Sequence, residues 1–423
     1  MAEPSLTSRH FVPLFITQAL GALNDNLFKN ALVVMALYSL SPGMAGALSA
    51  LSGGLFLLPY ILVSAPAGQL ADAHGKTRLM LWTKYWELGL MVLAFCGFLT
   101  GHFGFLLAVL LGLGLQAAFF SPLKYGILPE LFSGDRLVKS NGAIEAGTFA
   151  GIVLGTVAGG ILILLPQGRI WAPLAAICLS LAGIVSARMI PASRAAAPGL
   201  KPDWHLWRAN IELLRAAYHR GPVWFASLGI SWFWAMGATV LAAFPVLAKT
   251  WLHADGHVVT LLLAVFAMGV GVGSLAAARL VHARNLLHFV LPAGLGMSLF
   301  IADFAHVCAH LAAPDIPALL RHAPGWRALA DLALTALCGG VFSVPFYVML
   351  QANAAPSMRA RMVGANNILN AVATLAAGGV EAFAYAKGTS PAAILDAAAL
   401  FNLAVMGWIW RASRAARHTP SSG

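Results

Sequence analysis

Five polar side chains occupy two helical turns near the start of the chain, inside the otherwise apolar stretch 11–40. They are Asn24, Asp25, Asn26, Lys29 and Asn30. Asp25 and Lys29 are spaced i,i+4 with the acid first, so in a helix the two charges partly neutralise each other. Charged groups in an apolar helix are costly and point to a functional site. A polar stripe that only joins neighbouring helices is the alternative.

The composition places these residues in a membrane protein. The chain has 423 residues, of which 60% are hydrophobic and 10% charged. Soluble domains carry about 25% charged residues, so lipid must be the solvent for most of this chain. The formal net charge of +11 does not indicate nucleic acid, because Lys and Arg are dispersed at the ends of apolar stretches.

Twelve apolar stretches reach the length of about 20 residues that a membrane-spanning helix needs. Their approximate limits are 11–40, 45–71, 79–99, 103–125, 141–165, 169–190, 222–248, 257–281, 286–311, 328–350, 362–386 and 391–411. Because these stretches are continuously apolar and do not alternate, the sequence predicts membrane helices and excludes a β-barrel.

The basic residues predict the orientation. With the N-terminus in the cytoplasm, most of the 26 Lys and Arg fall on the cytoplasmic side. The exceptions are Lys29, Arg169, Lys249, Arg321, Arg327 and Lys387. By the positive-inside rule, both termini are expected in the cytoplasm.

A polar gap divides the twelve segments six and six. We predict an N-terminal six-helix bundle at 1–190, a cytoplasmic linker at 191–221 and a C-terminal bundle at 222–423. The linker carries a stripe at helical spacing: Trp204, Trp207, Ile211, Leu214 and Tyr218. This stripe predicts an amphipathic helix on the membrane surface, or a helix packed on the ends of the bundles.

The two halves also resemble each other. Phe120–Tyr125 has a counterpart in Phe342–Tyr347, and Asn141 with Glu145 corresponds to Asn366 with Asn370. Parallel six-helix repeats with a substrate handled between them are a transporter architecture.

The segment Gly68–Arg78 resembles the signature of the major facilitator superfamily between its second and third helices. The matching residues are Gly68, Asp72, Gly75, Lys76 and Arg78. The resemblance implies an all-α membrane fold in which Asp72 contacts the end of a neighbouring helix and locks one conformation of an alternating-access cycle. An anion at a helix N-terminus is favourable. In the second half, Gly273–Arg279 has Ala277 where the aspartate is expected.

Three further segments are similar to bacterial lysophospholipid transporters: 15–30, 121–131 and 137–146. This resemblance implies a multi-pass protein of the bacterial inner membrane that moves lysophospholipids to the cytoplasmic leaflet, where an acyltransferase reacylates them. It implies no nucleic-acid partner and, by analogy of fold, a monomer. We expect no cofactor, because the chain has no nucleotide-binding motif.

A zwitterionic lysophospholipid headgroup needs an acid for its ammonium and a base or amide for its phosphate. Asp25 is the first candidate for the ammonium and Glu145 the second. Lys29 and Lys124 are candidates for the phosphate, although Lys124 is also placed where a helix could simply end. The C-terminal half offers weaker candidates: Asn370, Trp234 and Tyr347.

Two other functions compete with lipid transport. A proton-coupled exporter of drugs or small amphiphilic solutes would share the fold, because fold does not fix the substrate. An acyltransferase would need a His-x4-Asp motif, and His310 and Asp315 have that spacing, but on the external side. Segments 222–248, 257–281 and 286–311 carry few polar groups, so a cavity between the two halves is expected to be polar on one side and apolar on the other. Such a cavity favours an amphiphilic substrate.

The chain has four cysteines, which are scattered singly in apolar segments: Cys96, Cys178, Cys308 and Cys338. We therefore predict buried structural thiols and no metal site.

Overall fold

The computed structural model describes residues 5–418, so both extreme ends of the predicted bundles, 1–4 and 419–423, lie outside the described residues. Within 5–418 the chain is helical and contains no strand. The first half comprises α1 (Val12–Ser39), α2 (Pro42–Ala73), α3 (Lys76–Thr100), α4 (Phe103–Leu131), α5 (Gly134–Leu164) and α6 (Gly168–Arg188).

A short helix α7 (Leu206–Tyr218) precedes the second half. That half comprises α8 (Gly221–Leu247), α9 (Gly256–Leu280), α10 (Val290–Ala309), the short α11 (Ile316–Arg321), α12 (Ala323–Asn353), α13 (Arg359–Ala386) and α14 (Pro391–His418). A π-helical turn, Ala248–Leu252, extends α8.

Each predicted membrane segment coincides with a long helix. Among the described residues, eleven helices are long and apolar enough to cross a membrane. Of the twelve long helices, α1 is the one that does not meet this measure; it has 28 residues but carries the polar cluster. Some helices are longer than predicted: α4 continues through Pro129 to Leu131, and α5 begins at Gly134. Membrane helices tolerate internal proline because neighbouring groups satisfy the freed backbone.

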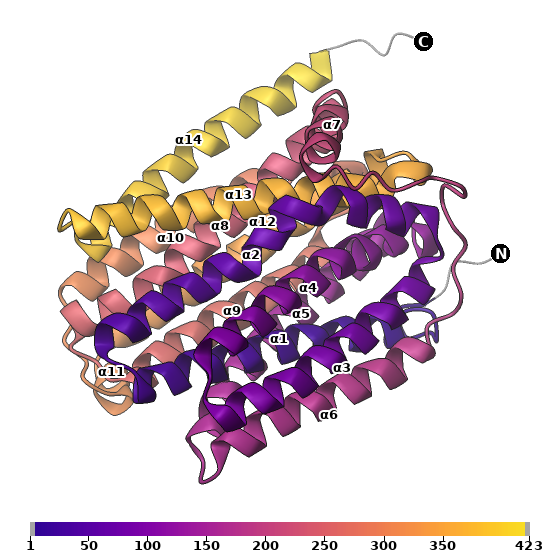
Figure 1. Cartoon of the computed structure of the whole chain (residues 1–423). Helices are drawn as coiled ribbons and strands as arrows, with labels where there is room; N and C mark the ends of the chain where they lie inside the picture. The colour runs from indigo at the N-terminus through magenta and orange to yellow at the C-terminus, as the bar shows by residue number, and fades with distance from the viewer. Residues whose placement is uncertain (1–4, 419–423) are drawn as a thin grey trace.

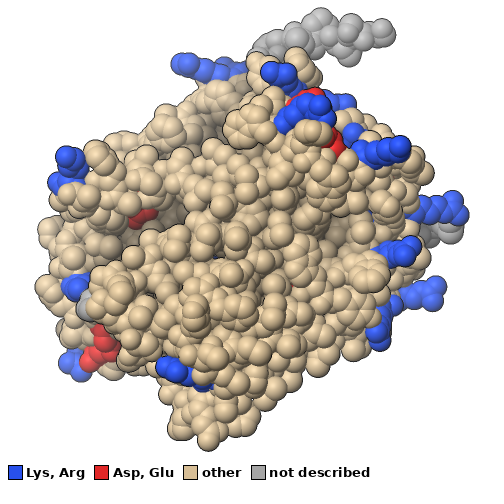
Figure 2. Space-filling model, viewed as in Figure 1, with Lys and Arg blue, Asp and Glu red and all other residues tan. Residues whose placement is uncertain are grey.

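The long helices lie side by side and reverse direction at each short turn (Figure 1). The start of α1 and the end of α14 lie at one end of the molecule, which we call the termini end, and the turn between α1 and α2 lies at the opposite end. In Figure 2, Lys and Arg gather at the two ends, and a broad band of uncharged residues separates them. This is the surface that a membrane-spanning bundle presents.

Glycines let α5 approach α1 closely. A side-chain carbon on Gly151 would lie 2.8 Å from the carbonyl oxygen of Ala19. At Gly155 and Gly159 the added atom would collide with the carbonyl oxygens of Leu23 and Leu27. The small-residue face of this helix therefore has a backbone-to-backbone contact with the helix that carries Asp25, as its four-residue spacing predicts.

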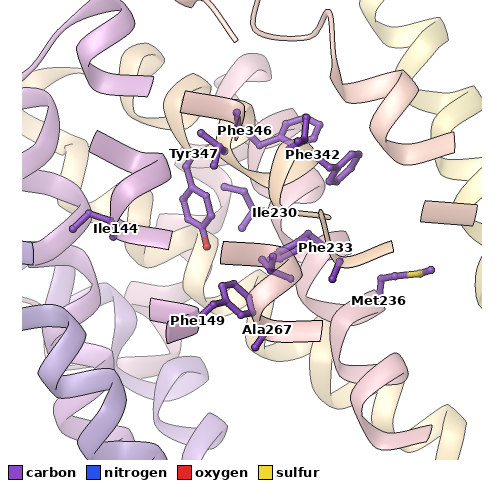
Figure 3. Close-up of a cluster of buried hydrophobic side chains, with 14 of the residues drawn as sticks. Ile144, Phe149, Ile230, Phe233, Met236, Ala267, Phe342, Phe346 and Tyr347 are labelled. Carbon is purple, nitrogen blue, oxygen red and sulfur yellow. The ribbon is translucent and has the colours of Figure 1, made fainter. Parts of the chain in front are cut away.

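The two halves meet mainly where α2 packs on α13, α5 on α9 and α12, and α4 on α12 and α13. Much of this interface is apolar and aromatic. Figure 3 shows Ile144 and Phe149 from α5 on one side of it, facing Phe233 from α8 and Tyr347 from α12. The cavity described below lies within this interface.

Helix α7 packs through one face on α2, α8 and α13. The buried residues on that face are Ala209, Asn210, Leu213 and Ala217. The predicted stripe is divided: Trp204, Trp207 and Tyr218 are exposed, whereas Ile211 and Leu214 are half-buried and Leu214 packs against the core. Ahead of the helix, the backbone N–H of His205 and the guanidinium of Arg208 hold the pKa of Asp203 below its usual range.

The expectation of buried cysteines is wrong for two of the four. Cys308 is buried and Cys338 is partly buried, but Cys96 and Cys178 are exposed. Both exposed thiols lie in membrane-spanning helices, where an apolar side chain is stable against lipid as well as inside the protein.

Candidate functional site

A cavity of about 420 Å³ lies between the two halves. The first half contributes all the charged residues of its lining: Asp25, Lys29, Lys84, Glu87 and Lys124. The second half contributes aromatic, apolar and uncharged polar residues, among them Phe233, Trp234, Leu241, Phe266 and Asn370. The cavity is thus charged on one side and largely apolar on the other, as the distribution of polar residues in the sequence predicts.

Asp25 is the charged residue of this lining that has a buried side-chain atom, Oδ1, without a hydrogen-bond partner among the described residues. Lys29, one turn later, places Nζ 5.9 Å from the ring centroid of Phe56. Asp25 and Lys29 form no ion pair in the described part of the chain, but their opposite charges attract each other, as the i,i+4 spacing predicts. Since neither group is in direct contact with the other, both can still contact a ligand.

The polar cluster of α1 has two distinct parts. Asn26 lines the cavity with Asp25 and Lys29. Asn24 is fully buried and donates to Glu87 Oε1 at 3.1 Å and to Ser180 at 2.9 Å. Asn30 donates to the carbonyl oxygen of Thr156 at 2.6 Å. The structure therefore places Asn24 and Asn30 outside the cavity, where they join helices, and leaves three of the five residues facing it.

Sequence reasoning missed the ion pair between Lys84 and Glu87. Lys84 Nζ lies 2.6 Å from Glu87 Oε2, and the two side chains are 1% and 2% exposed. Gly21 makes room for this lysine, because a side-chain carbon on Gly21 would lie 2.6 Å from Nζ. We expected Lys84 at a cytoplasmic helix end. The i,i+3 spacing of opposite charges in an apolar helix could have identified the pair.

Lys124 also lines the cavity and does not mark the end of its helix, since α4 continues to Leu131. Its Nζ lies 4.7 Å from the ring centroid of Tyr125. A lysine above an aromatic face is held by cation–π attraction and keeps its charge available.

Glu145 lies behind a layer of aromatic rings and does not line the cavity. It is fully buried and accepts a hydrogen bond from the hydroxyl of Tyr125. Tyr125 stacks on Tyr347 at 4.8 Å between ring centroids, and Trp234 Nε1 donates to the Tyr347 hydroxyl at 2.9 Å. A ligand in the cavity would therefore meet these rings before Glu145.

Asn370, Trp234 and Tyr347, the three candidates from the second half, all line the cavity, and Asn370 is the amide among them. Its Oδ1 accepts a hydrogen bond from the Ser231 hydroxyl at 2.8 Å. This bond fixes the amide so that its Nδ2 group remains available as a donor.

The signature segment contacts the second half at the termini end. Asp72, which is fully buried, accepts hydrogen bonds from the backbone N–H groups of Ala360 and Arg361, each at 3.2 Å, and from Arg361 Nε at 3.1 Å. Both residues begin α13, so the carboxylate lies at a helix N-terminus, where the macrodipole favours it. A side-chain carbon on Gly68 would lie 2.8 Å from Arg361 Cα.

The remaining residues of the segment have local roles. Lys76 is buried and pairs with Glu130 at 2.6 Å. Gly75 allows the linker to pass, because an added carbon would lie 2.5 Å from the carbonyl oxygen of Ser193. Arg78 is exposed and has no ion-pair partner in the described chain.

Hydrogen bonds close the interface at the termini end of the cavity. Asn141 and Gln351 exchange two, at 2.8 and 2.9 Å. Ser121 donates to Asn367 at 3.1 Å, and Asp135 accepts from the backbone N–H of Ala283 at 2.8 Å.

In Figure 1, helices α2 and α13 lie apart toward the opposite end. Only 17% of the most apolar stretch of each is buried, compared with 33% or more in the other spans. The contacts between the halves thus close the termini end of the cavity, whereas α2 and α13 are poorly buried toward the opposite end.

The chain is similar to proteins of known family. The Major Facilitator Superfamily profile matches residues 14–378. The lysophospholipid transporter LplT of Citrobacter koseri is 32% identical over 415 residues, which cover 96% of this chain and 97% of that protein. LplT of Escherichia coli O157:H7 gives the same identity and coverage.

Solved structures resemble it in fold. The human organic anion transporter MFSD10 superposes with a TM-score of 0.73 at 15% identity, over 94% of this chain and 99% of that one. A bacterial homologue of the iron transporter ferroportin superposes with a TM-score of 0.67 at 14% identity, over 93% and 98%.

Proposed function

Because the chain belongs to the Major Facilitator Superfamily of membrane transporters, we propose that it transports lysophospholipids such as lysophosphatidylethanolamine from the outer to the cytoplasmic leaflet of the bacterial inner membrane. The observation that carries the proposal is the division of the cavity, with every charged lining residue in one half. An amphiphile has the same division between headgroup and acyl chain.

The charged side of the cavity fits a zwitterionic headgroup. The unpartnered carboxylate of Asp25 receives the ammonium of the lipid. Lys29 and Lys124 supply positive charge for the phosphate, and Asn26 and Asn370 supply amide hydrogen bonds. Asn24, Asn30 and Glu145 support the helices that carry these groups.

The apolar side of the cavity fits the start of an acyl chain. Phe233, Trp234, Leu241 and Phe266 line it without charge. Helices α2 and α13 are poorly buried toward the opposite end, which gives a lipid a lateral path between them from the bilayer. A lipid that entered there would keep its tail in an apolar environment throughout.

The sealed end is the cytoplasmic end in this proposal, because most basic residues outside the cavity lie there. The contact of Asp72 with the start of α13 then holds the transporter open to the outside. Breaking that contact opens the cytoplasmic side and completes an alternating-access cycle. The gating residues are Gly68, Asp72, Gly75 and Lys76, with Arg78 free at the surface.

Residues 1–190 and 222–423 form the two moving bundles in this cycle, and 191–221 links them. The exposed Trp204, Trp207 and Tyr218, with Arg208 and Arg215 beside them, rest on the anionic surface of the membrane. The transporter acts as a monomer and delivers lysophospholipid to an acyltransferase at the cytoplasmic leaflet.

One observation favours a second function, proton-coupled export of an amphiphilic solute. Glu145 has one carboxylate oxygen, Oε2, that is buried without a hydrogen-bond partner, and Asp25 has another. Buried carboxylates of this kind carry protons in coupled transporters.

Uptake of labelled lysophosphatidylethanolamine by proteoliposomes tests the two functions. Lipid transport predicts protein-dependent movement of the lipid across the bilayer, with or without a proton gradient. Competition by excess glycerophosphoethanolamine, which has the headgroup and no acyl chain, reports whether the apolar side contributes. Absence of lipid movement under both conditions would overturn the proposal and favour the exporter.

A further inference from the structure

Helix α2 contains two internal prolines, Pro59 and Pro66, and the burial of the helix changes near Pro66. Pro66 has no backbone N–H, so the carbonyl of Leu62 lacks its usual donor four residues later. A buried carbonyl without a donor is costly in a membrane protein, because no water replaces the missing bond. Another group must satisfy Leu62.

Asn210 of α7 supplies that bond. Its Nδ2 donates to the carbonyl oxygen of Leu62 at 2.8 Å and to that of Ile61 at 2.9 Å. Its Oδ1 accepts from the backbone N–H of Ala65 at 3.1 Å. Ile61 and Ala65 are each other's ordinary helical partners, so one side chain of the linker satisfies three backbone groups around Pro66.

Helix α13 packs against the same part of α2. A side-chain carbon on Gly364 would lie 2.6 Å from the carbonyl oxygen of Ser64 and 3.5 Å from Leu213 Cδ2. Ser64 belongs to α2 and Leu213 to α7. Three helices from the two halves and the linker therefore converge on residues 61–66.

Burial changes at this junction in both long helices. In α2, residues 64–68 are all buried, whereas none of residues 53–58 is. In α13, residues 362–368 are all buried, whereas among 372–386 only Glu381 is. The packed parts lie toward the termini end, and the parts that line the cavity and face the membrane lie toward the opposite end.

We propose that Asn210 is a positioning residue of the transport cycle. It stabilises a hinge in α2 at Pro66, and it thereby connects the linker helix α7 to the part of α2 that lines the cavity. The cavity-lining part, with Phe56 and Tyr60, bends at this hinge while the part that carries Asp72 stays packed. This bending of α2 does not depend on which substrate is carried.

Spin labels at Gly46 in α2 and Gly378 in α13 measure the motion. An added side-chain carbon meets nothing within 4 Å at either position, so the labels leave the packing unchanged. The four natural cysteines are first replaced, and the distance distribution is recorded for the full chain in lipid without substrate. Asn210→Ala should broaden the distribution, because nothing then fixes the bend. An unchanged distribution would overturn the proposal.

Two further variants separate a hinge from a purely structural role. Pro66→Ala restores a backbone N–H that can donate to the carbonyl of Leu62, so α2 no longer needs Asn210 there. The double variant Pro66→Ala, Asn210→Ala should therefore regain a narrow distance distribution. This expectation holds even if Asn210→Ala alone folds poorly. A double variant as broad as Asn210→Ala would refute the role of Pro66. Glu212→Ala is the matched control, since Glu212 is exposed on the same helix, and it should leave the distribution unchanged.

Discussion

At the residue scale, Asp25 is the main candidate for contact with a ligand. Its Oδ1 is buried without a hydrogen-bond partner among the described residues, and three nearby lysines, Lys29, Lys84 and Lys124, attract its charge. A buried polar atom without a partner is costly, and such an atom in the wall of a cavity is typical of a position that a ligand completes.

Asp25→Asn should therefore reduce transport without unfolding the protein. A hydrogen bond to a charged group contributes about 1.5–3 kcal/mol, so the rate at low substrate concentration should fall roughly 10- to 100-fold. Thermal stability should change little, because no described contact of Oδ1 is lost. The same change at the exposed Asp396 is the control, and equal transport by both variants would contradict the role of Asp25.

The Lys84–Glu87 pair has a structural consequence as well. Glu87→Met leaves the ammonium of Lys84 buried without its counter-charge and removes an acceptor of Asn24. Breaking a buried pair costs about 3–5 kcal/mol, whereas replacing both partners by apolar residues is often neutral. We expect thermal unfolding in detergent to show a large fall in the melting temperature of Glu87→Met. The double variant Lys84→Met, Glu87→Met should show a smaller fall. Equal losses would show that pairing is unimportant.

At the scale of elements, the position of Asp25 depends on how closely α1 approaches α5. The carbonyls of Leu23 and Leu27, which flank Asp25 on the helix, lie against Gly155 and Gly159. A side chain at either glycine must push α1 away, and the cavity would lose the geometry of its charged side.

Gly155→Ala should therefore lower both the thermal stability and the transport rate. Overpacking of this kind costs about 1–3 kcal/mol. Gly407→Ala in α14 is the control, because an added carbon there meets nothing within 4 Å. Stability of the Gly155 variant equal to that of the control would show that α1 can shift at no cost.

At the scale of the whole molecule, the carboxylate of Asp72 is one of the groups that join the two halves. Asp72 from α2 receives three hydrogen bonds from the first turn of α13, on the side of the cavity that is sealed. Such a contact exists in one conformation and must break in the other, so it biases the equilibrium between them.

Asp72→Asn should shift that equilibrium toward the state that is closed at the opposite end. With spin labels at Gly46 and Gly378, the population at short distance should rise, since the amide keeps the shape but loses the charge. Arg78→Gln changes an exposed, unpaired residue of the same segment and should leave the distribution as it was. Identical distributions for the two variants would remove Asp72 as a lock.

The helices, the class of protein and the charged residues of the membrane segments could all be predicted from the sequence. Membrane helices are predictable because lipid leaves the backbone no other way to satisfy its hydrogen bonds, so length and hydropathy suffice. The motif Gly68–Arg78 and the cluster at Asn24–Asn30 were visible for a related reason, since charge is rare and costly in such helices.

Which of these charges face the cavity could not be predicted, because it depends on how the helices pack. Asn24 and Asn30 share a helix with Asp25 but turn toward other helices, and Lys84 and Lys124 lie in the cavity although their sequence positions suggested helix ends. The rotation of each helix depends on packing against its neighbours, such as the glycines of α5 against α1, and no local pattern encodes it. The bond from Asn210 to α2 joins residues 148 positions apart, so only the folded chain reveals it.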